Sequence, residues 1–412
     1  MKNIKTLLNP YRGLRREIYI IFISKTINAM GALIFPFMTL LLSSKIGLSG
    51  AQTGFYMTLI GVFYAPASLL GGKLSDTFGR KKILIGFELL AAICYIICIF
   101  LPAGMPMVYT LMAASFFFGV AGPSHDAMTA DLTTPEQREG AYSLNYLGFN
   151  LGFAFAQIIA GFLFKDYFYI MFIIDAVTAL IGIMLIAFFV KETLDKNPKT
   201  ENDEEIRSDK SILSVLLAKP VLIFFAIAAF GYKFVYSQWP FLMPLHAEFN
   251  FPGEGAKLFG MLGSFNALIV VICTPLLTAL FSGKTNIRRI FYAGILFTIG
   301  FGMLGFISVK AAFFISVFIF TVGEILEAVS TMPFIMNHTP ASHRGRMSSI
   351  IPMIMGAGYS VGPIVMGAVL DEYSFQYSWI IAASVVLVST IAMKSIDLTS
   401  SRMVIQNSQM HQ

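Results

Sequence analysis

Long apolar runs separated by short polar segments recur along the whole chain. We identify about twelve, each of about 18 to 25 residues, which as an α-helix spans a hydrocarbon core of about 30 Å. The runs lack the polar and apolar alternation typical of the strands of a membrane barrel. The pattern predicts an all-α polytopic membrane protein with transmembrane helices at roughly 17–42, 52–73, 83–101, 107–130, 141–164, 168–190, 217–244, 257–281, 289–309, 311–335, 346–370 and 377–394.

The composition agrees with this prediction. Hydrophobic residues make up 56% of the 412 residues, charged residues only 13%, and the mean hydropathy is +0.74. A soluble protein of this length needs far more charge to cover its surface. The first apolar run is too long for the core of a signal peptide, and no small-residue cleavage site follows it, so we expect no cleavable signal.

Basic residues are concentrated in every second polar segment, beginning with the N-terminal tail. The positive-inside rule places such segments in the cytoplasm, so we expect both termini there, in a multi-pass protein of the cell (plasma) membrane. The formal net charge of +6 follows from this bias and gives no support to a nucleic-acid partner. The basic residues of these segments include Arg12, Arg16, Arg80, Lys81, Lys82, Arg138, Lys191, Arg207, Lys284, Arg288, Arg344 and Arg346.

One charged stretch divides the chain into two halves. Residues 191–210 have no apolar face to bury, so we predict a solvated cytoplasmic linker at 191–216 between a six-helix bundle at 1–190 and another at 217–412. The halves also resemble each other, because residues 134–140 and 339–345 each hold Thr-Pro, an arginine and a glycine before an apolar run. Two halves related by a parallel repeat are typical of secondary transporters, with the substrate site between them near the membrane midplane.

The segment 72–82 is the most specific motif of the chain. It is a charged stretch between two apolar runs, and we expect a short loop there. Gly72 and Gly79 frame an aspartate and an arginine, and glycine at these positions permits close helix packing and a sharp turn. A loop so short and so specific favours a mechanical role over that of a simple connector.

We expect this segment to act as a conformational latch on the cytoplasmic side. Arg80 is placed to pair with Asp131 at the inner end of the fourth span. Asp76 is placed to accept hydrogen bonds from free amides at the start of the eleventh span, near 346–348, because a helix N-terminus favours an anion. The alternative is a topology-setting loop with ordinary surface charges.

These features together resemble the major facilitator superfamily over nearly the whole chain. The family motif between spans two and three is Gly-x-Leu-Ala-Asp-x-x-Gly-Arg-Lys, and only its alanine differs here, as Ser75. Residues 131–138 and 323–325 are most similar to bacterial twelve-helix drug:proton antiporters. The resemblance implies two pseudo-symmetric bundles, alternating access and a proton gradient as the energy source, with no cofactor. The motif is matched by Gly72, Leu74, Asp76, Gly79, Arg80 and Lys81.

Glycines recur in the fifth and eleventh spans, where we expect them to allow close helix packing. The glycine-proline motif of the family is degraded in span five, which keeps Gly148 and Gly152 without the proline. Span eleven holds a better copy, with Gly358, Gly362 and Pro363.

Two glutamates, Glu324 and Glu327, lie one helical turn apart in the tenth span. Ionisable groups inside a bilayer are costly and tend to face the bundle interior or an aqueous cavity. We expect Glu324, on which the family resemblance rests, to carry a coupling proton or contact a substrate cation. The residues leave open a static ion pair between one of these glutamates and a lysine.

Other polar residues within the spans are candidates for a substrate cavity, because the resemblance implies that spans one, four, seven and ten line it. For Asp126, which follows His125, a proton relay and a solvated helix end both remain open. Glu88 and Asp175 are expected to form structural pairs or to lie at a cavity mouth. The cavity candidates are Lys25 and Asn28 in span one, Asp126 in span four, and Lys233 and Tyr236 in span seven.

Enzyme motifs find no support in the sequence. There is no phosphate-binding glycine-rich loop, and the five histidines and three cysteines lack metal-ligand spacing. We therefore predict a monomeric, proton-coupled secondary transporter that exports lipophilic or drug-like compounds, with protons, a small-molecule substrate and membrane lipids as partners. The alternatives are a proton-coupled importer of a small nutrient and a lipid flippase of the same fold.

Overall fold

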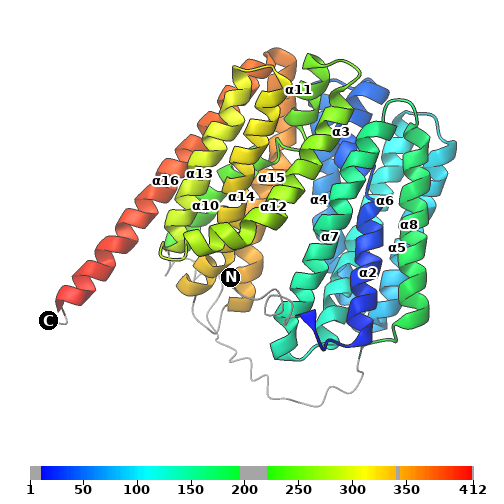
Figure 1. The fold of residues 1–412 in the computed structure, drawn as a ribbon, viewed down its shortest axis with the longest axis horizontal. Coiled ribbons are helices and arrows are strands. Elements are labelled where there is room, and N and C mark those ends of the chain that lie inside the picture. Colours follow the sequence, from blue (N-terminus) through cyan, green and yellow to red (C-terminus); the bar gives the residue numbers. More distant parts are fainter. Residues whose placement is uncertain (1–10, 195–219, 340–343, 411–412) are drawn as a thin grey trace. The chain divides into compact units, whose positions relative to one another are not determined.

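Every regular element in the described part of the chain is a helix, so the predicted all-α membrane fold is confirmed (Figure 1). The computed structural model describes residues 11–194, 220–339 and 344–410. Within them, 11 helical segments are long and apolar enough to cross a membrane, and a shorter apolar helix lies in the seventh predicted span. The main helices are α2 (Arg16–Met30), α4 (Gly50–Phe78), α5 (Arg80–Phe100), α6 (Met105–Asp131), α7 (Pro135–Leu163), α8 (Phe168–Phe189), α10 (Pro220–Tyr236), α11 (Leu242–Asn250), α12 (Gly255–Leu280), α13 (Asn286–Gly302), α14 (Lys310–His338), α15 (Arg344–Glu372) and α16 (Phe375–Met410).

The first and seventh predicted spans are interrupted helices. In the first, α2 ends at Met30, and the chain passes through the 3-10 helix η2 (Phe35–Phe37), which contains Pro36, before α3 (Met38–Leu40) and the π-helix η3 (Leu41–Lys45). In the seventh, α10 ends shortly before Pro240. Both predicted spans therefore contain a break, because proline lacks the amide that a helix interior needs and disfavours helix in the residue before it.

The chain divides into two compact units that do not follow the chain order strictly. Unit 1 comprises Met1–Leu48, Tyr56–Lys199 and Ala247–Ala267, and unit 2 comprises Ser49–Phe55, Thr200–His246 and Leu268–Gln412. The boundary between the units falls within α4 and within α12. The N-terminal part of α4 belongs to unit 2 and the rest to unit 1, whereas the N-terminal part of α12 belongs to unit 1 and the rest to unit 2. Most of the predicted linker, residues 195–216, lies outside the described residues, and the predicted halves at 1–190 and 217–412 stay a prediction.

Unit 1 is held together by close packing of α2 on α7 and α8, and of α5 on α6 and α8. The expected packing glycines of span five lie at the first of these contacts. A Cβ atom at Gly148 would collide with the Thr26 side chain, and one at Gly152 with the Thr26 carbonyl oxygen. The backbones of α2 and α7 approach this closely only because these positions lack side chains.

Unit 2 repeats the arrangement with α10 packed on α15 and α16, and α13 packed on α14 and α16. Gly358 and Gly362 of α15 occupy the close contact with α10, where a Cβ atom would collide with the Phe230 carbonyl oxygen and the Ser237 hydroxyl respectively. Pro363 lies inside α15 directly after this contact. Each unit therefore has a helix pair that packs closely through two glycines of one helix.

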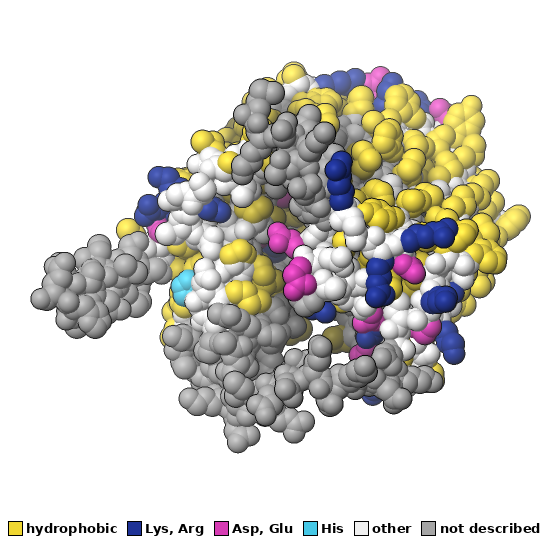
Figure 2. All heavy atoms as spheres, turned by 60° about the horizontal axis from the view of Figure 1, so that its bottom comes forward, with side chains coloured by type: hydrophobic (Ala, Val, Ile, Leu, Met, Phe, Trp, Pro, Cys, Tyr) yellow, Lys and Arg dark blue, Asp and Glu magenta, His cyan; other side chains and the backbone are white. Residues whose placement is uncertain are grey.

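The flanks of the helices expose large hydrophobic side chains. Leu69 is 78% exposed, Phe100 81% and Phe188 78%, which only a lipid environment accommodates over a whole surface. Figure 2 shows such a hydrophobic flank on unit 1, and beside it basic and acidic side chains gathered on the end that is turned forward. This pattern is that of a membrane-embedded surface ending in a polar interface.

The segment 72–82 is not the loop expected from its charge. Helix α4 continues to Phe78, α5 begins at Arg80, and only Gly79 lies between them. The φ angle of Gly79 is +114°, a conformation that residues with a Cβ atom rarely adopt. A single glycine thus reverses the chain, and Asp76 lies in the last turn of a helix.

Candidate functional site

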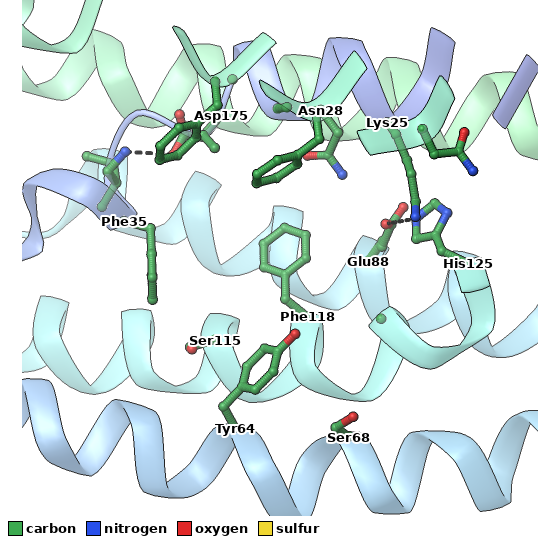
Figure 3. Close-up of a pocket in the computed structure, with 18 of the residues that line it drawn as sticks. Lys25, Asn28, Phe35, Tyr64, Ser68, Glu88, Ser115, Phe118, His125 and Asp175 are labelled. Carbon is green, nitrogen blue, oxygen red and sulfur yellow. Dashed lines mark hydrogen bonds and ion pairs between the residues drawn. The ribbon is translucent and has the colours of Figure 1, made fainter. Parts of the chain in front are cut away.

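Unit 1 contains a pocket of about 1030 Å³ between α2, α4, α5, α6, α7 and α8. Its walls are mostly apolar and rich in aromatic side chains. The rings of Phe35, Tyr64 and Phe118 lie in its interior (Figure 3). Further aromatic residues line it, namely Tyr95, Tyr142, Tyr146, Phe149 and Phe153.

The three cavity residues predicted in spans one and four all line this pocket. Lys25 Nζ lies 3.2 Å from Asp126 Oδ1 and forms an ion pair with it. Asn28 lies one turn further along α2. The side chain of Asp126 is 63% exposed and that of Lys25 22% exposed, so this pair is open to a pocket occupant.

A second polar pair, between a glutamate and a histidine, lies buried in the pocket wall. No sequence pattern predicts that these two residues are in contact. Glu88 of α5 places Oε1 at 2.9 Å from Nε2 of His125 of α6, and both residues are buried. We expected Glu88 to form a structural pair or to lie at a cavity mouth, and it is both paired and pocket-lining. An isolated glutamate within an apolar run was the signal for it, but the run itself does not reveal the partner.

Asp175 of α8 has a structural role at the interrupted first span. Its two carboxylate oxygens accept hydrogen bonds from the backbone amides of Leu33, at 3.0 Å, and Ile34, at 3.2 Å. These amides lie in the break after α2, outside the regular hydrogen-bond pattern of the helix. A buried carboxylate therefore compensates for a broken helix within the membrane-spanning region.

The predicted residues of spans seven and ten come together in unit 2. Lys233 Nζ lies 2.8 Å from Oε2 of Glu327, which is buried, and Thr331 donates a hydrogen bond to Oε1 of the same carboxylate at 3.0 Å. Lys233 also lies over the ring of Tyr236, 5.9 Å from its centroid. The sequence left open an ion pair between a lysine and one of the two glutamates, and in the structure that glutamate is Glu327.

Glu324 has different neighbours from Glu327. It is half-buried, and the Tyr236 phenol donates a hydrogen bond to it. Tyr359 of α15 lies near the same carboxylate. The two glutamates therefore occupy distinct environments, one bound to a lysine and the other to a phenol.

The latch residues of unit 1 form a connected polar network. Arg80 Nη1 lies 2.5 Å from Asp76 Oδ1, and Arg80 Nε lies 2.6 Å from Asp131 Oδ2. Thr193 donates a hydrogen bond to Oδ2 of Asp131 at 2.9 Å. The pairing expected between Arg80 and Asp131 is present. The partner expected for Asp76 at the start of span eleven includes Arg346 and Ser348, whose side chains lie outside the described residues.

Glu192 was missed as a member of this network, because it lies in the stretch predicted to be a solvated linker. Its carboxylate accepts the backbone amide of Arg80 at 2.8 Å and so caps the N-terminus of α5. Burial raises the pKa of Glu192, but hydrogen bonds from the amides of Leu194, Lys81, Arg80 and Thr193 outweigh burial and hold this pKa below its usual range. The described residues contain no group of three or more His, Cys, Asp or Glu that could hold a metal ion.

Comparison with known proteins identifies one protein family, and the similar proteins include transporters. The family model described as Major Facilitator Superfamily matches residues 21–351 and 288–402. The chain is 22% identical over 386 residues to a "Na(+), Li(+), K(+)/H(+) antiporter" of Planococcus maritimus, covering 87% of this chain and 90% of the relative. It is 24% identical over 357 residues to the class B tetracycline resistance protein of Escherichia coli, covering 84% and 86%. It is 22% identical over 387 residues to multidrug resistance protein 2 of Bacillus subtilis, covering 91% and 94%.

Solved structures share the fold at low sequence identity. A peptide transporter POT in complex with sulfate superposes with a TM-score of 0.75 at 16% identity, covering 95% of this chain and 96% of the other. The nucleoside transporter NupG superposes with a TM-score of 0.74 at 13% identity, covering 93% and 99%. At this identity the likeness shows the fold alone.

Proposed function

The chain belongs to the Major Facilitator Superfamily, and we propose that it is a proton-driven exporter of lipophilic compounds that works by alternating access. The superfamily itself makes the chain a multi-pass membrane transporter. Substrate, direction and energy source must be argued from the site, because one fold serves many functions.

The observation that carries the proposal is the pocket of unit 1. Its volume of about 1030 Å³ accommodates a drug-sized molecule. Its walls are mostly apolar and rich in aromatic side chains, and flat rings offer stacking and apolar contact without demanding one hydrogen-bond pattern. A lipophilic compound therefore fits the pocket best.

The charges in the pocket favour a neutral or cationic compound. Lys25 is paired with Asp126, so its positive charge is compensated. Glu88 is paired with His125, which is an ion pair only when the imidazole is protonated. Aromatic faces also attract cations. The names of two relatives, a tetracycline resistance protein and a multidrug resistance protein, support export of such compounds.

Proton coupling is supported by the acidic groups in the membrane-spanning helices. Glu324, Glu327 and Asp126 are the coupling candidates, and carboxylates inside transporters commonly form proton relays. A relative named as a Na(+), Li(+), K(+)/H(+) antiporter supports proton exchange in a chain of this kind. The same name makes exchange of monovalent cations the second candidate function.

We further infer a monomer in the plasma membrane with both termini in the cytoplasm. The basic residues at the end of α4, the start of α7 and the end of α8 support this orientation, since they belong to segments expected inside by the positive-inside rule. Accessibility of single cysteines placed at Lys82 and Lys310 to an impermeant thiol reagent in intact cells tests it. Reaction at Lys82 but not at Lys310 would contradict it.

The transport proposal is tested in proteoliposomes with an imposed pH gradient. The assay compares fluorescent lipophilic cations, a sugar, a dipeptide, and sodium and potassium ions in parallel vesicles. We expect the lipophilic cations to be concentrated against their gradient in exchange for protons, and this movement to stop when an ionophore collapses the pH gradient. Accumulation of only the sugar or dipeptide would favour import of a nutrient, and accumulation of only the metal ions would favour cation exchange.

A further inference from the structure

Glu88 and His125 form a buried pair whose outer atoms have no fixed partner. Glu88 is 2% exposed and His125 8%, and the pair is joined by the contact of 2.9 Å between Oε1 and Nε2 (Figure 3). Glu88 Oε2 and His125 Nδ1 are also buried, and neither has a hydrogen-bond partner among the described residues. The pair therefore has one satisfied hydrogen bond and two unsatisfied polar atoms at a pocket wall.

We propose that Glu88 and His125 together bind a transported proton and release it when a cation occupies the pocket of unit 1. The inference rests on the proposed proton-driven export and adds a proton site to the candidates Asp126 in unit 1 and Glu324 and Glu327 in unit 2. A carboxylate and an imidazole in contact hold one proton between them, either as a neutral pair or as an ion pair. Both forms have no net charge, which burial in a membrane-spanning region favours.

The comparison with Asp175 distinguishes this pair from a structural one. Asp175 is equally buried and lines the same pocket, but both of its oxygens accept backbone amide hydrogen bonds. Such bonds fix a carboxylate and stabilise its charge. Glu88 has no such amide bonds among the described residues. It is therefore free to gain and lose a proton without breaking a structural contact.

The lysine that lines the pocket already has a carboxylate partner. Lys25 is engaged with Asp126, and the Tyr142 hydroxyl donates to the Asp126 carbonyl oxygen. Loss of the shared proton leaves one negative charge in the pocket wall, so a cation is needed to balance it. The other charged and titratable groups that line the pocket are Lys25 of α2, Tyr64 of α4, Tyr95 of α5, Asp126 of α6, Tyr142 and Tyr146 of α7, and Asp175 of α8.

The exchange that follows is balanced in charge. A cation enters the pocket, the proton leaves Nε2 or Oε1 to water, and the pair keeps one negative charge beside the cation. When the cation departs, a proton from water returns to the same hydrogen bond. Only an N–H or O–H bond is broken and formed, and no other reactant is required.

Proton release on binding of tetraphenylphosphonium tests the proposal. Purified full-length protein in weakly buffered detergent solution is titrated with this cation while pH is recorded. We expect Glu88→Gln and His125→Gln each to release one proton fewer per bound cation than the wild type. Glu139→Gln, at an exposed position of α7, and His338→Gln, in α14, are the matched controls and should release as many as the wild type. Unchanged release from the Glu88 and His125 variants would overturn the proposal.

A wild-type measurement keeps the proposal testable if these variants do not fold. Nitrogen-15 NMR of labelled histidines follows His125 through about pH 5 to pH 9, and its ring-nitrogen signals should shift on addition of tetraphenylphosphonium, because loss of the proton from either Nε2 or Oε1 changes the hydrogen bond at Nε2. A His125 signal that is insensitive to the cation would overturn the proposal. Failure of the wild type to concentrate any lipophilic cation would instead contradict the proposed function, while cation-linked proton release at the pair would still be observed.

Discussion

The guanidinium of Arg80 donates a hydrogen bond from Nε to Oδ2 of Asp131, at 2.6 Å, and this bond joins the start of α5 to the end of α6. The two side chains are partly shielded from solvent, with 16% and 28% exposed, so each helps to compensate the charge of the other. The same guanidinium binds Asp76, which places three charges within a single network. The contact stabilises one arrangement of these helix ends, as a conformational latch requires.

A double-mutant cycle tests whether this contact acts as a unit. We expect Arg80→Ala and Asp131→Ala each to lower the transport rate by about tenfold, equivalent to about 1.4 kcal/mol, because the first leaves Asp131 without its arginine and the second leaves Arg80 with Asp76 alone. The double variant should be no worse than the poorer single variant. The measurement is dye transport normalised to membrane protein. Strictly additive single effects would mean that the two residues do not cooperate.

Asp76→Asn should reduce transport far more than it reduces the amount of folded protein in the membrane. The side chain of Asp76 is 67% exposed, so its contact with Arg80 adds little to folding stability. We expect a loss of transport of about tenfold or more with a nearly unchanged thermal midpoint, because the charge is needed in the transport cycle. Thr77→Ala, at the neighbouring position on α4, is the control. A transport rate equal to that of the wild type in the Asp76 variant would contradict a role for Asp76 in the latch.

Removing the carboxylate of Glu192 should destabilise the start of α5. The loss of a helix cap costs about 1 kcal/mol, so Glu192→Gln should lower the thermal midpoint in detergent at neutral pH. Because the folded-state pKa lies below its usual value, this stabilisation is present above the ordinary glutamate pKa and disappears as pH falls through the folded-state value. The difference between wild type and variant should therefore vanish in acid. A difference that persists at low pH would contradict capping by the charged form.

The sequence predicts the parts of this protein that depend on composition and local motif. Apolar runs locate the helices, and the glycines at Gly152 and Gly358 identify the close helix contacts. It fails where the outcome depends on a partner distant in the chain. Nothing local joins Glu88 to His125, 37 residues away, or Glu192 to the start of α5, 112 residues away.

The segment 72–82 shows a different limit of sequence-based prediction. Its charges and glycines suggested a loop, because such residues are common in turns. The hydroxyls of Ser75 and Thr77 bond to carbonyls within α4, and the helix continues to Phe78. At the end of a membrane span, charged residues reach the polar interface without leaving the helix, so polarity alone does not locate the turn.

Glu324→Gln should abolish accumulation driven by a pH gradient while leaving downhill exchange partly intact. The amide imitates a permanently protonated carboxyl group, so substrate movement is no longer tied to proton release. The measurement compares uphill and downhill dye movement in the same vesicles, with Glu372→Gln at the exposed end of α15 as the control. A variant that still concentrates the dye would move the coupling role to another carboxylate, with Asp126 next.

Lys233 and Glu327 should behave as a structural pair, in contrast to Glu324. Their contact of 2.8 Å lies inside unit 2, and Glu327 is 4% exposed, so removing either charge leaves the other poorly solvated. We expect Glu327→Gln and Lys233→Met each to lower the free energy of unfolding by about 2 to 3 kcal/mol. The double variant should recover most of this loss, because it removes both charges together.

The roles of Glu324 and Glu327 are distinguished by measuring two properties of each variant, its thermal midpoint and its ability to concentrate dye against a gradient. Lys233→Met with Glu327→Gln should fold and still concentrate dye against its gradient, because neither charge carries the transported proton in this assignment. Glu324→Gln should show the reverse, with a thermal midpoint near that of the wild type and no uphill transport. If the double variant is stable but cannot couple, the proton of unit 2 belongs to Glu327, and the ion pair with Lys233 is then a step of the transport cycle rather than a support for the fold.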